Sequence, residues 1–287
     1  MKIVVLGKNG MLGHMVMSYL TKQDNVEVFG TDRTNFCAKT FVQNNINGII
    51  GGKNQDALPN IKNADYVINC IGTIKPCIKE EDTDSVANAL MVNSLFPRYM
   101  ADYCEKHNTR MIHITTDCVY SGSDIVGKPE NSYHDPQDVY GKSKSLGEPE
   151  NCMIVRTSII GPEKTNKRSL LEWVLSKSKG EDIYGFKNHI WNGVTTLELS
   201  RCLYDIIDAD IPDNRFNKLY HIHNFYNMSK FKLLEMINDV YELGLNIKES
   251  RTEEPCYRTM SSTESMCMLL EIPTITNQLR ELKKWIL

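Results

Sequence analysis

The sequence predicts an α/β fold built on a doubly wound parallel sheet, followed by a smaller C-terminal lobe. Two observations lead to this prediction. Short runs rich in Val and Ile alternate with helical stretches through the first 157 residues, and three regularly spaced glycines span the junction between the first run and the first helical stretch. Parallel strands need a crossover connection, usually a helix, and repeated strand–helix units form a sheet with helices on both faces. A chain of 287 residues is long enough for a sizeable core.

The elements follow in order along the chain. Strands are expected at residues 2–6, 26–30, 65–69, 110–114 and 153–157. Helices are expected at 11–22, 85–107 and 139–148, with Pro97 kinking the second, and 120–138 has the composition of a loop. Beyond residue 161 the alternation loosens into helices at 169–179, 195–207, 229–243 and 276–285 and a strand at 218–223. We therefore expect one domain at 1–161 and a lobe at 162–287, with some of its segments returning to the first domain.

Composition excludes several classes of protein. The chain has 33 Lys and Arg against 36 Asp and Glu, and 41% of its residues are hydrophobic, which are globular values. A net charge of -3 gives no general attraction to nucleic acid, and no run approaches the length of a membrane span. The nine cysteines contain no CxxC pair, so we expect neither a metal site nor a disulfide framework. With no secretory signal, they indicate a cytoplasmic protein.

A glycine turn joins the first strand to the first helix. Gly7, Gly10 and Gly13 let the backbone approach a pyrophosphate at the helix N-terminus, so the turn, including Asn9, Met11 and Leu12, predicts a dinucleotide site. Asp32 stands 19 residues after Gly13, where a carboxylate binds a ribose 2′-hydroxyl and favours NADH. The adjacent Arg33 suits a 2′-phosphate and favours NADPH. The two residues leave both cofactors open.

A second constellation suits proton transfer. Tyr140 and Lys144 are four residues apart and share one face of a predicted helix. An ammonium group beside a phenol lowers the pKa of the phenol, which could then exchange a proton with a carbonyl oxygen. Thr116, at the end of a predicted strand, could orient that oxygen, because doubly wound sheets bind ligands at the carboxyl ends of their strands. Taken alone, Tyr-x-x-x-Lys is common on helix surfaces.

The sequence resembles a known family at these positions. The glycine turn, N-C-I-G (69–72), Asn93, the strand end at 115–117 and Tyr140-x-x-x-Lys144 resemble the extended short-chain dehydrogenase/reductases, which have a Rossmann-like fold. T-T-D-C-V-Y-S-G (115–122), V-Y-G-K-S-K-S-L-G-E (139–148) and I-V-R-T-S-I-I-G (154–161) are similar to the dTDP-4-dehydrorhamnose reductases. The resemblance implies that NADPH or NADH reduces the 4-keto group of a dTDP- or UDP-linked 4-keto-6-deoxyhexose, in the biosynthesis of deoxysugars for polysaccharides.

The resemblance also implies residue roles. Tyr140 would donate the proton, Lys144 would lower the pKa of Tyr140 and bind the nicotinamide ribose, and Thr116 would bind the substrate oxygen. The cofactor would contact Cys70, Ile71 and Gly72, with Asn93 as a structural or water-relay position. Candidate substrate residues are Asp117, Cys118, Lys187, Trp191 and Arg258. A homodimer would form through the helices at 85–107 and 139–148.

Two alternatives stay open. In a relative that epimerises before it reduces, a catalytic cysteine occupies the position of Cys118, so this chain could be a bifunctional 3,5-epimerase/4-reductase. The acid on the other face of the sugar would come from Lys177, Lys179, Lys187 or His189, whereas a packing role for the thiol is the more ordinary interpretation. The other alternative is a catalytically silent NAD(P)-binding regulatory subunit. We interpret His113, inside a predicted strand, as a core histidine with satisfied hydrogen bonds.

Overall fold

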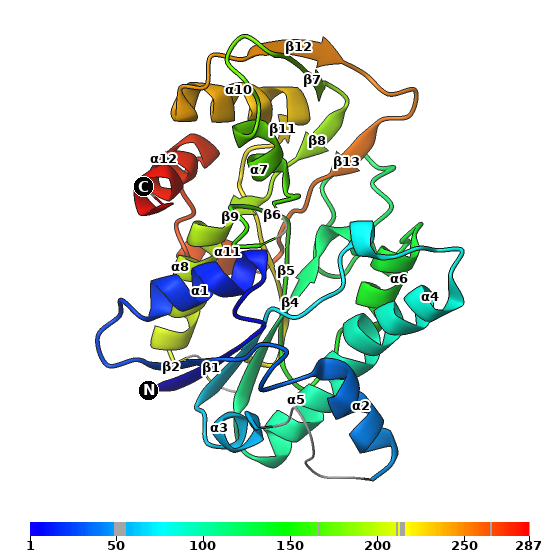
Figure 1. Cartoon of the computed structure of the whole chain (residues 1–287), viewed down its shortest axis with the longest axis vertical. Helices are drawn as coiled ribbons and strands as arrows, with labels where there is room; N and C mark the ends of the chain where they lie inside the picture. Colours follow the sequence, from blue (N-terminus) through cyan, green and yellow to red (C-terminus); the bar gives the residue numbers. More distant parts are fainter. Residues whose placement is uncertain (49–55, 166, 211, 213–215, 265, 287) are drawn as a thin grey trace.

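The computed structural model describes residues 1–48, 56–165, 167–210, 212, 216–264 and 266–286. A six-stranded parallel sheet forms its centre, with a smaller lobe beyond one end of the strands (Figure 1). The strands are β1 (Lys2–Leu6), β2 (Glu27–Gly30), β3 (Tyr66–Asn69), β4 (Arg110–Thr116), β5 (Met153–Thr157) and β10 (Leu219–Ile222), in the order β10-β5-β4-β3-β1-β2. The predicted doubly wound α/β fold is confirmed.

Helices cover both faces of this sheet. Alternate residues of the strands, such as Val5, Ile112 and Val155, face a core shared with α1 (Met11–Leu20) and α8 (Thr196–Asp208). The intervening residues, such as Val67, face α2 (Ala38–Ile46), α3 (Leu58–Lys62) and α5 (Phe96–Lys106). Because both faces are buried, the strands consist of nearly continuous apolar runs instead of alternating with polar residues.

The helical stretch predicted at 85–107 has three parts. They are α4 (Thr83–Leu90), the π-helical turn η2 (Met91–Leu95) and α5. Pro97 lies in the first turn of α5, where a missing N–H is tolerated. The interruption therefore lies just before the proline and contains Asn93. The helix predicted at 139–148 is α6 (Val139–Leu146), which begins at the capping side chain of Asp138.

The C-terminal lobe contains short strands that the sequence did not predict. β7 (Asp182–Phe186) pairs with β12 (Asn246–Ser250), and β8 (His189–Trp191) lies between β11 (Met228–Ser229) and β13 (Cys256–Arg258). β6 (Ile159–Ile160) pairs with β9 (Val194–Thr195). These strands have two to five residues each and pair across long stretches of sequence, so no local turn signal identifies them.

Helices of the lobe connect it to the sheet. The apolar side chains of α7 (Leu170–Leu175), α10 (Lys230–Tyr241) and α12 (Ile275–Ile286) form a third core. Near the end of α12, the ring of Trp285 stacks on Tyr19 of α1 at 5.7 Å, so this helix packs against the first one. The remaining elements are α11 (Met266–Leu269) and the single turns η1 (Lys75–Cys77) and η3 (Asp117–Val119). Among the described residues, no helix combines the length and the apolar character that crossing a membrane requires.

Candidate active site

The glycine turn lies where the strand order of the sheet reverses. β1 pairs with β2 on one side and with β3 on the other, and a crevice for ligands opens at such a switch point. Gly7 has φ of +85°, and a Cβ on it would come within 3.0 Å of the Ile71 side chain. A Cβ on Gly13 would lie 2.2 Å from the Gly7 carbonyl oxygen. The turn, with Asn9, Gly10, Met11 and Leu12, is therefore packed too closely for side chains at Gly7 and Gly13, and it directs the N-terminus of α1 at the crevice.

Asp32 and Arg33 follow β2, at the same end of the sheet as the glycine turn. The Asp32 carboxylate accepts hydrogen bonds from the backbone and hydroxyl of Thr34, at 2.9 and 2.6 Å, and lies 3.0 Å from the ammonium of Lys8. The hydrogen bonds from Thr34 and Lys8 hold the pKa of Asp32 well below its usual range. Arg33 is exposed. Lys8 was missed in the sequence, although it lies inside the glycine turn.

The segment after β3 forms the other wall. Cys70 and Ile71 are partly buried, and a Cβ on Gly72 would lie 3.0 Å from the Lys144 ammonium nitrogen. Asn93 is fully buried; its side chain accepts from the Thr73 N–H at 2.8 Å and donates to the Thr73 carbonyl at 2.9 Å and to the Ser143 hydroxyl at 3.0 Å. These bonds fasten this wall to α6.

Tyr140 and Lys144 both come from α6. The Lys144 ammonium is buried and donates to the Ile114 carbonyl of β4 at 3.5 Å. Burial lowers the pKa of Lys144 to about 8, and the Glu148 carboxylate opposes that change. Burial and the nearby Cys118 raise the pKa of Tyr140, while a hydrogen bond with Thr116 lowers it. The sequence led us to expect a lowered pKa for this phenol; in the structure burial dominates instead.

Thr116 organises the end of β4. Its hydroxyl donates to the Asp117 carboxylate at 3.1 Å and accepts from the Cys118 N–H at 3.1 Å, which closes the η3 turn. A Cβ on Gly141 would lie 2.3 Å from the Cys118 carbonyl oxygen, so only glycine allows α6 to approach this turn. The structure thus brings Thr116, at the end of β4, into contact with Tyr140 of α6.

Cys118 and Arg258 also meet here. Burial raises the pKa of the Cys118 thiol to about 12; the Asp117 carboxylate adds to the effect and the Arg258 guanidinium opposes it. Arg258 extends from β13 of the lobe and donates a hydrogen bond to the Tyr120 carbonyl. The thiol is therefore protonated at neutral pH, next to a cation from the opposite lobe.

The other predicted substrate residues have different surroundings. Trp191 is buried and its indole N–H donates to the Ser158 hydroxyl at 2.8 Å. The Lys187 ammonium pairs with Glu249 at 2.5 Å and lies over the ring of Phe231. The proposed acids for the epimerase alternative have contacts of their own: Lys187 as described, Lys177 with Glu181, Lys179 against Gly244, and His189 with Thr252.

Lys230 is a further candidate site residue, which the sequence did not indicate. It is the first residue of α10, and its ammonium lies 4.6 Å from the centroid of the Trp191 ring. Burial lowers the pKa of Lys230 to about 8, and Asp117, Cys256 and Cys118 oppose that change. Its position depends on the antiparallel pairing of β11 with β8, which no local pattern predicts.

Comparisons with known proteins point to one family. A family profile described as RmlD substrate binding domain matches residues 1–275. A dTDP-4-dehydrorhamnose reductase of Aggregatibacter actinomycetemcomitans is 25% identical over 199 residues, which cover 64% of this chain and 59% of that protein. The aligned part therefore spans less than two thirds of the length of this relative.

Two solved structures have the same fold over nearly their whole length. A dTDP-4-dehydrorhamnose reductase of Clostridium acetobutylicum superposes with a TM-score of 0.79 at 21% identity, covering 100% of this chain and 99% of that one. A dTDP-4-dehydrorhamnose reductase of Bacillus anthracis, solved in complex with NADP, has a TM-score of 0.76 at 18% identity, covering 99% of this chain and 98% of that one.

Proposed function

Because the chain belongs to the RmlD substrate binding domain family, we propose that it is an NAD(P)H-dependent oxidoreductase acting on the 4-keto group of a nucleotide-linked 4-keto-6-deoxyhexose. The observation that carries the proposal is the meeting of Thr116, Tyr140 and Lys144 at the carboxyl end of β4, next to the glycine turn. In this proposal residues 1–161 hold the cofactor, and 162–287 mainly hold the sugar nucleotide.

The glycine turn fits a dinucleotide. The close approach of Gly13 to Gly7 leaves the backbone of the turn and the N–H groups of α1 available for a pyrophosphate. Bound NADPH or NADH would supply the hydride. Asp32 or Arg33 would contact the adenosine ribose, and the segment from Cys70 to Gly72 would line the opposite wall. The exposed Arg33 supports NADPH, as does the NADP complex of the reductase from Bacillus anthracis, whereas the Lys8 ammonium is paired with Asp32.

The residues of this chain would supply the proton. The raised pKa of Tyr140 keeps the phenol protonated at neutral pH, so it can act as the general acid toward the 4-keto oxygen. The Thr116 hydroxyl, already in contact with the phenol, would orient the same oxygen. With a pKa of about 8, Lys144 is mainly an ammonium at neutral pH and can bind a ribose hydroxyl and stabilise the phenolate that forms.

The substrate would lie between the strand ends and the lobe. Arg258 and Lys230 extend from β13 and α10 toward Asp117 and Cys118, so two cations from the lobe face the catalytic turn. A guanidinium suits the diphosphate of a dTDP- or UDP-linked sugar. Asp117 would accept a hydrogen bond from a sugar hydroxyl. The ring of Trp191 packs against the Lys230 ammonium.

The epimerase-reductase alternative needs a thiolate at Cys118. A thiol with a pKa of about 12 is a poor source of thiolate at neutral pH, which favours the simple reductase. A catalytically silent subunit would not need Tyr140 and Lys144 to be placed as they are.

A second copy of the chain is part of the proposal. Large apolar side chains are exposed on the helices expected at a dimer interface: Leu90 of α4 at 38%, Leu95 of η2 at 39% and Leu146 of α6 at 58%. We place this homodimer in the cytoplasm, where scattered thiols stay reduced. Sedimentation of the purified chain would test the dimer, and a monomer at micromolar concentration would contradict it.

The proposed reaction can be tested directly. Oxidation of NADPH and of NADH is followed with dTDP- and UDP-linked 4-keto-6-deoxyglucose, each with and without a separate 3,5-epimerase. Turnover only with the epimerase supports a dedicated reductase. Turnover without it, with an epimerised product, would make Cys118 catalytic. If every combination fails although the cofactor binds, the activity proposed here is wrong.

A further inference from the structure

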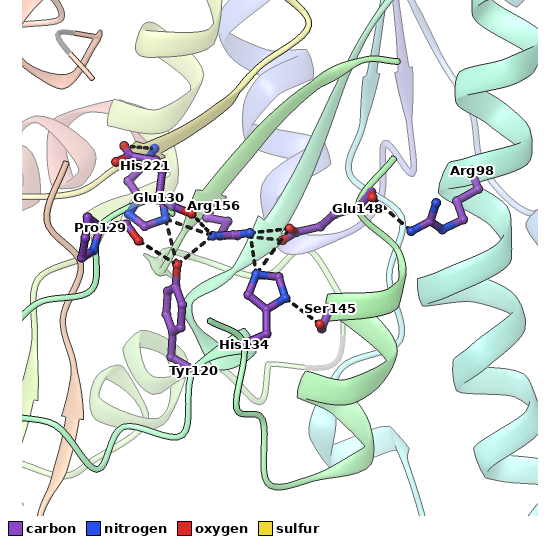
Figure 2. Close-up of polar contacts among 9 residues, drawn as sticks. All are labelled: Arg98, Tyr120, Pro129, Glu130, His134, Ser145, Glu148, Arg156 and His221. Atoms are coloured by element: carbon purple, nitrogen blue, oxygen red, sulfur yellow. Dashed lines mark hydrogen bonds and ion pairs between the residues drawn. The ribbon is translucent and has the colours of Figure 1, made fainter. Parts of the chain in front are cut away.

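Arg156 of β5 lies at the centre of a buried polar network that includes Tyr120, His134 and Glu148 (Figure 2). Its side chain is almost completely buried, and all five N–H donors of its guanidinium have acceptors. Two go to the Glu148 carboxylate, at 2.9 and 2.6 Å, and one each to the Tyr120 hydroxyl at 2.7 Å, the Glu130 carbonyl at 3.1 Å and His134 Nε2 at 2.5 Å. A planar guanidinium can satisfy this set, whereas an ammonium with three donors cannot.

The two histidines of the network are held neutral. An arginine only donates, so His134 Nε2 accepts, and His134 Nδ1 must carry the proton that it shares with the Ser145 hydroxyl at 2.6 Å. His221 is the other histidine: its Nε2 lies 3.5 Å from Arg156 Nη1 and 3.4 Å from the Tyr120 hydroxyl, and its Nδ1 donates to the Ser261 carbonyl at 2.8 Å. Burial, together with the charge of Arg156, lowers the pKa of each ring.

The network holds the end of the catalytic helix. Ser145 follows Lys144 directly, and Glu148 lies just beyond the last turn of α6. Arg98 of α5 adds bonds to the Leu146 and Glu148 carbonyls at 2.7 and 3.2 Å. The C-terminal end of the eight-residue helix is therefore tied to β5, to the loop of His134 and to α5 (Figure 2).

The same network reaches the substrate lobe. The Tyr120 hydroxyl accepts a hydrogen bond from Arg156, and the Tyr120 backbone carbonyl accepts one from Arg258. The Glu130 carbonyl accepts from Arg156, while its carboxylate accepts from the Ser262 hydroxyl at 2.6 Å and the Thr263 N–H at 2.9 Å. Two short paths thus lead from Arg156 to the lobe segment that presents Arg258.

We propose that Arg156 is a positioning residue, which holds the helix of Tyr140 and Lys144 in a fixed relation to the lobe segment around Arg258. The proposal rests on the proposed function, since it assigns these residues to catalysis and to substrate binding. Arg156 acts on the helix through Glu148 and His134, and on the lobe through Tyr120 and Glu130.

The pKa of Lys144 depends on this network. Burial lowers its pKa to about 8, and the two groups that oppose the change are Glu148, held by Arg156, and Cys70. The thiol of Cys70 has a pKa of about 12 and is uncharged at neutral pH, and burial, together with the charge of Lys144, lowers the pKa of His113, so that ring is neutral. His113 contacts Asn69 through Nδ1, but its Nε2 has no hydrogen-bond partner among the described residues, so the expected satisfied hydrogen bonding holds for one ring nitrogen only. Of these groups, Glu148 is therefore the carboxylate that raises the pKa of Lys144.

Arg156→Lys is the first test, with Arg201→Lys as its control. Arg201 also binds a glutamate twice, Glu198 at 2.5 and 3.3 Å, but it lies on α8. Hydrogen exchange needs no turnover: R156K is expected to speed exchange about tenfold or more in both α6 and residues 257–263, and R201K in neither. Unchanged exchange of α6 in R156K overturns the proposal, whether or not the wild type reduces a sugar nucleotide.

Kinetics separate positioning from simple loss of stability. In R156K that remains folded, kcat is expected to fall about 10- to 100-fold, with little change in cofactor KM.

Glu148→Gln removes the carboxylate, so the pKa of Lys144 falls and the basic limb of the pH–rate profile moves to lower pH by about one unit. Glu150→Gln, an exposed matched change, should not move it. An unmoved limb in E148Q contradicts the proposal. If R156K does not fold, Ser145→Ala, which removes the hydrogen bond to His134, takes its place. Faster hydrogen exchange of α6 in this variant supports the proposal, and unchanged exchange overturns it.

Discussion

The Lys75 ammonium lies 2.7 Å from the Asp138 carboxylate, which also accepts a hydrogen bond from the Gly141 N–H at 2.8 Å. Asp138 is the N-cap of α6, so one side chain both starts the helix that carries Tyr140 and Lys144 and joins it to the segment after β3. That segment also binds Asn93, whose other partner is Ser143 of α6. The N-terminal half of α6 is thereby fixed to the wall of the proposed cofactor crevice.

Asp138 should stabilise the fold in a pH-dependent way. Burial raises its pKa, but the Gly141 N–H and Lys75 outweigh burial and leave it lowered. A lowered pKa contributes stability above the unfolded value, near 3.8, which is lost as the pH falls through the folded value. Asp138→Ala should cost about 1 kcal/mol of unfolding free energy at pH 7. Asp138→Asn retains a cap, so its smaller cost should shrink between pH 7 and pH 3 in urea unfolding; a cost independent of pH would contradict this assignment.

Tyr140→Phe should abolish most of the proposed reduction. Removing a general acid lowers kcat by about 10²- to 10⁴-fold, whereas binding of NADPH, measured by fluorescence, should be nearly unchanged. Tyr133→Phe is the matched control, because that ring is 95% exposed in the loop before α6. Retention of full kcat in Y140F would remove the phenol from the mechanism.

The rate should decline at alkaline pH because of Lys144. The ammonium form is the one that stabilises a phenolate, and its pKa is about 8, so kcat/KM should fall as the pH rises through that value in the free enzyme. Burial raises the pKa of Tyr140, so deprotonation of the phenol does not limit the rate in the pH range where Lys144 loses its proton. A plateau extending beyond pH 10 would exclude a pKa of about 8 for the essential group.

The parts of the site that the sequence predicts are those encoded by short spacing. Gly7, Gly13, Tyr140 and Lys144 lie within local motifs, and the positions of these motifs after strands or on a helix fixed their places in the sheet. In contrast, α2 has only three buried residues, Ala38, Phe41 and Val42, so its amphipathic pattern was too short to detect.

The residues contributed by the lobe could not be predicted in the same way. Lys230 reaches the Asp117 turn only because β11 pairs with β8, and Arg258 only because β13 pairs with the other edge of β8. Lys187, near Trp191 in sequence, instead pairs with Glu249 of β12. The direction of the pKa shift of Tyr140 could not be predicted from the sequence either, because it depends on how deeply α6 is buried against η3.

Gly13→Ala should disturb the glycine turn more than Gly10→Ala. The added Cβ would lie 2.2 Å from the Gly7 carbonyl oxygen at position 13 but 3.5 Å from it at position 10, which is an ordinary contact. Moving α1 away from the turn should cost about 1–3 kcal/mol of stability and weaken NADPH binding. Thermal unfolding and cofactor titration of both variants test this; equal effects at the two positions would show that close packing of the turn is not decisive.

Cys118→Ser distinguishes the reductase from the epimerase-reductase. The two side chains are nearly isosteric, so a simple reductase should reduce pre-epimerised substrate within about threefold of the wild-type rate. A thiol with a pKa of about 12 should not exchange protons beside the ketone, so product formed in D₂O by either protein should carry no enzyme-dependent deuterium at C3 or C5. Deuterium that appears with the wild type and disappears with C118S would mean that the bound substrate and the nearby Arg258 lower the pKa of the thiol enough to make it a base.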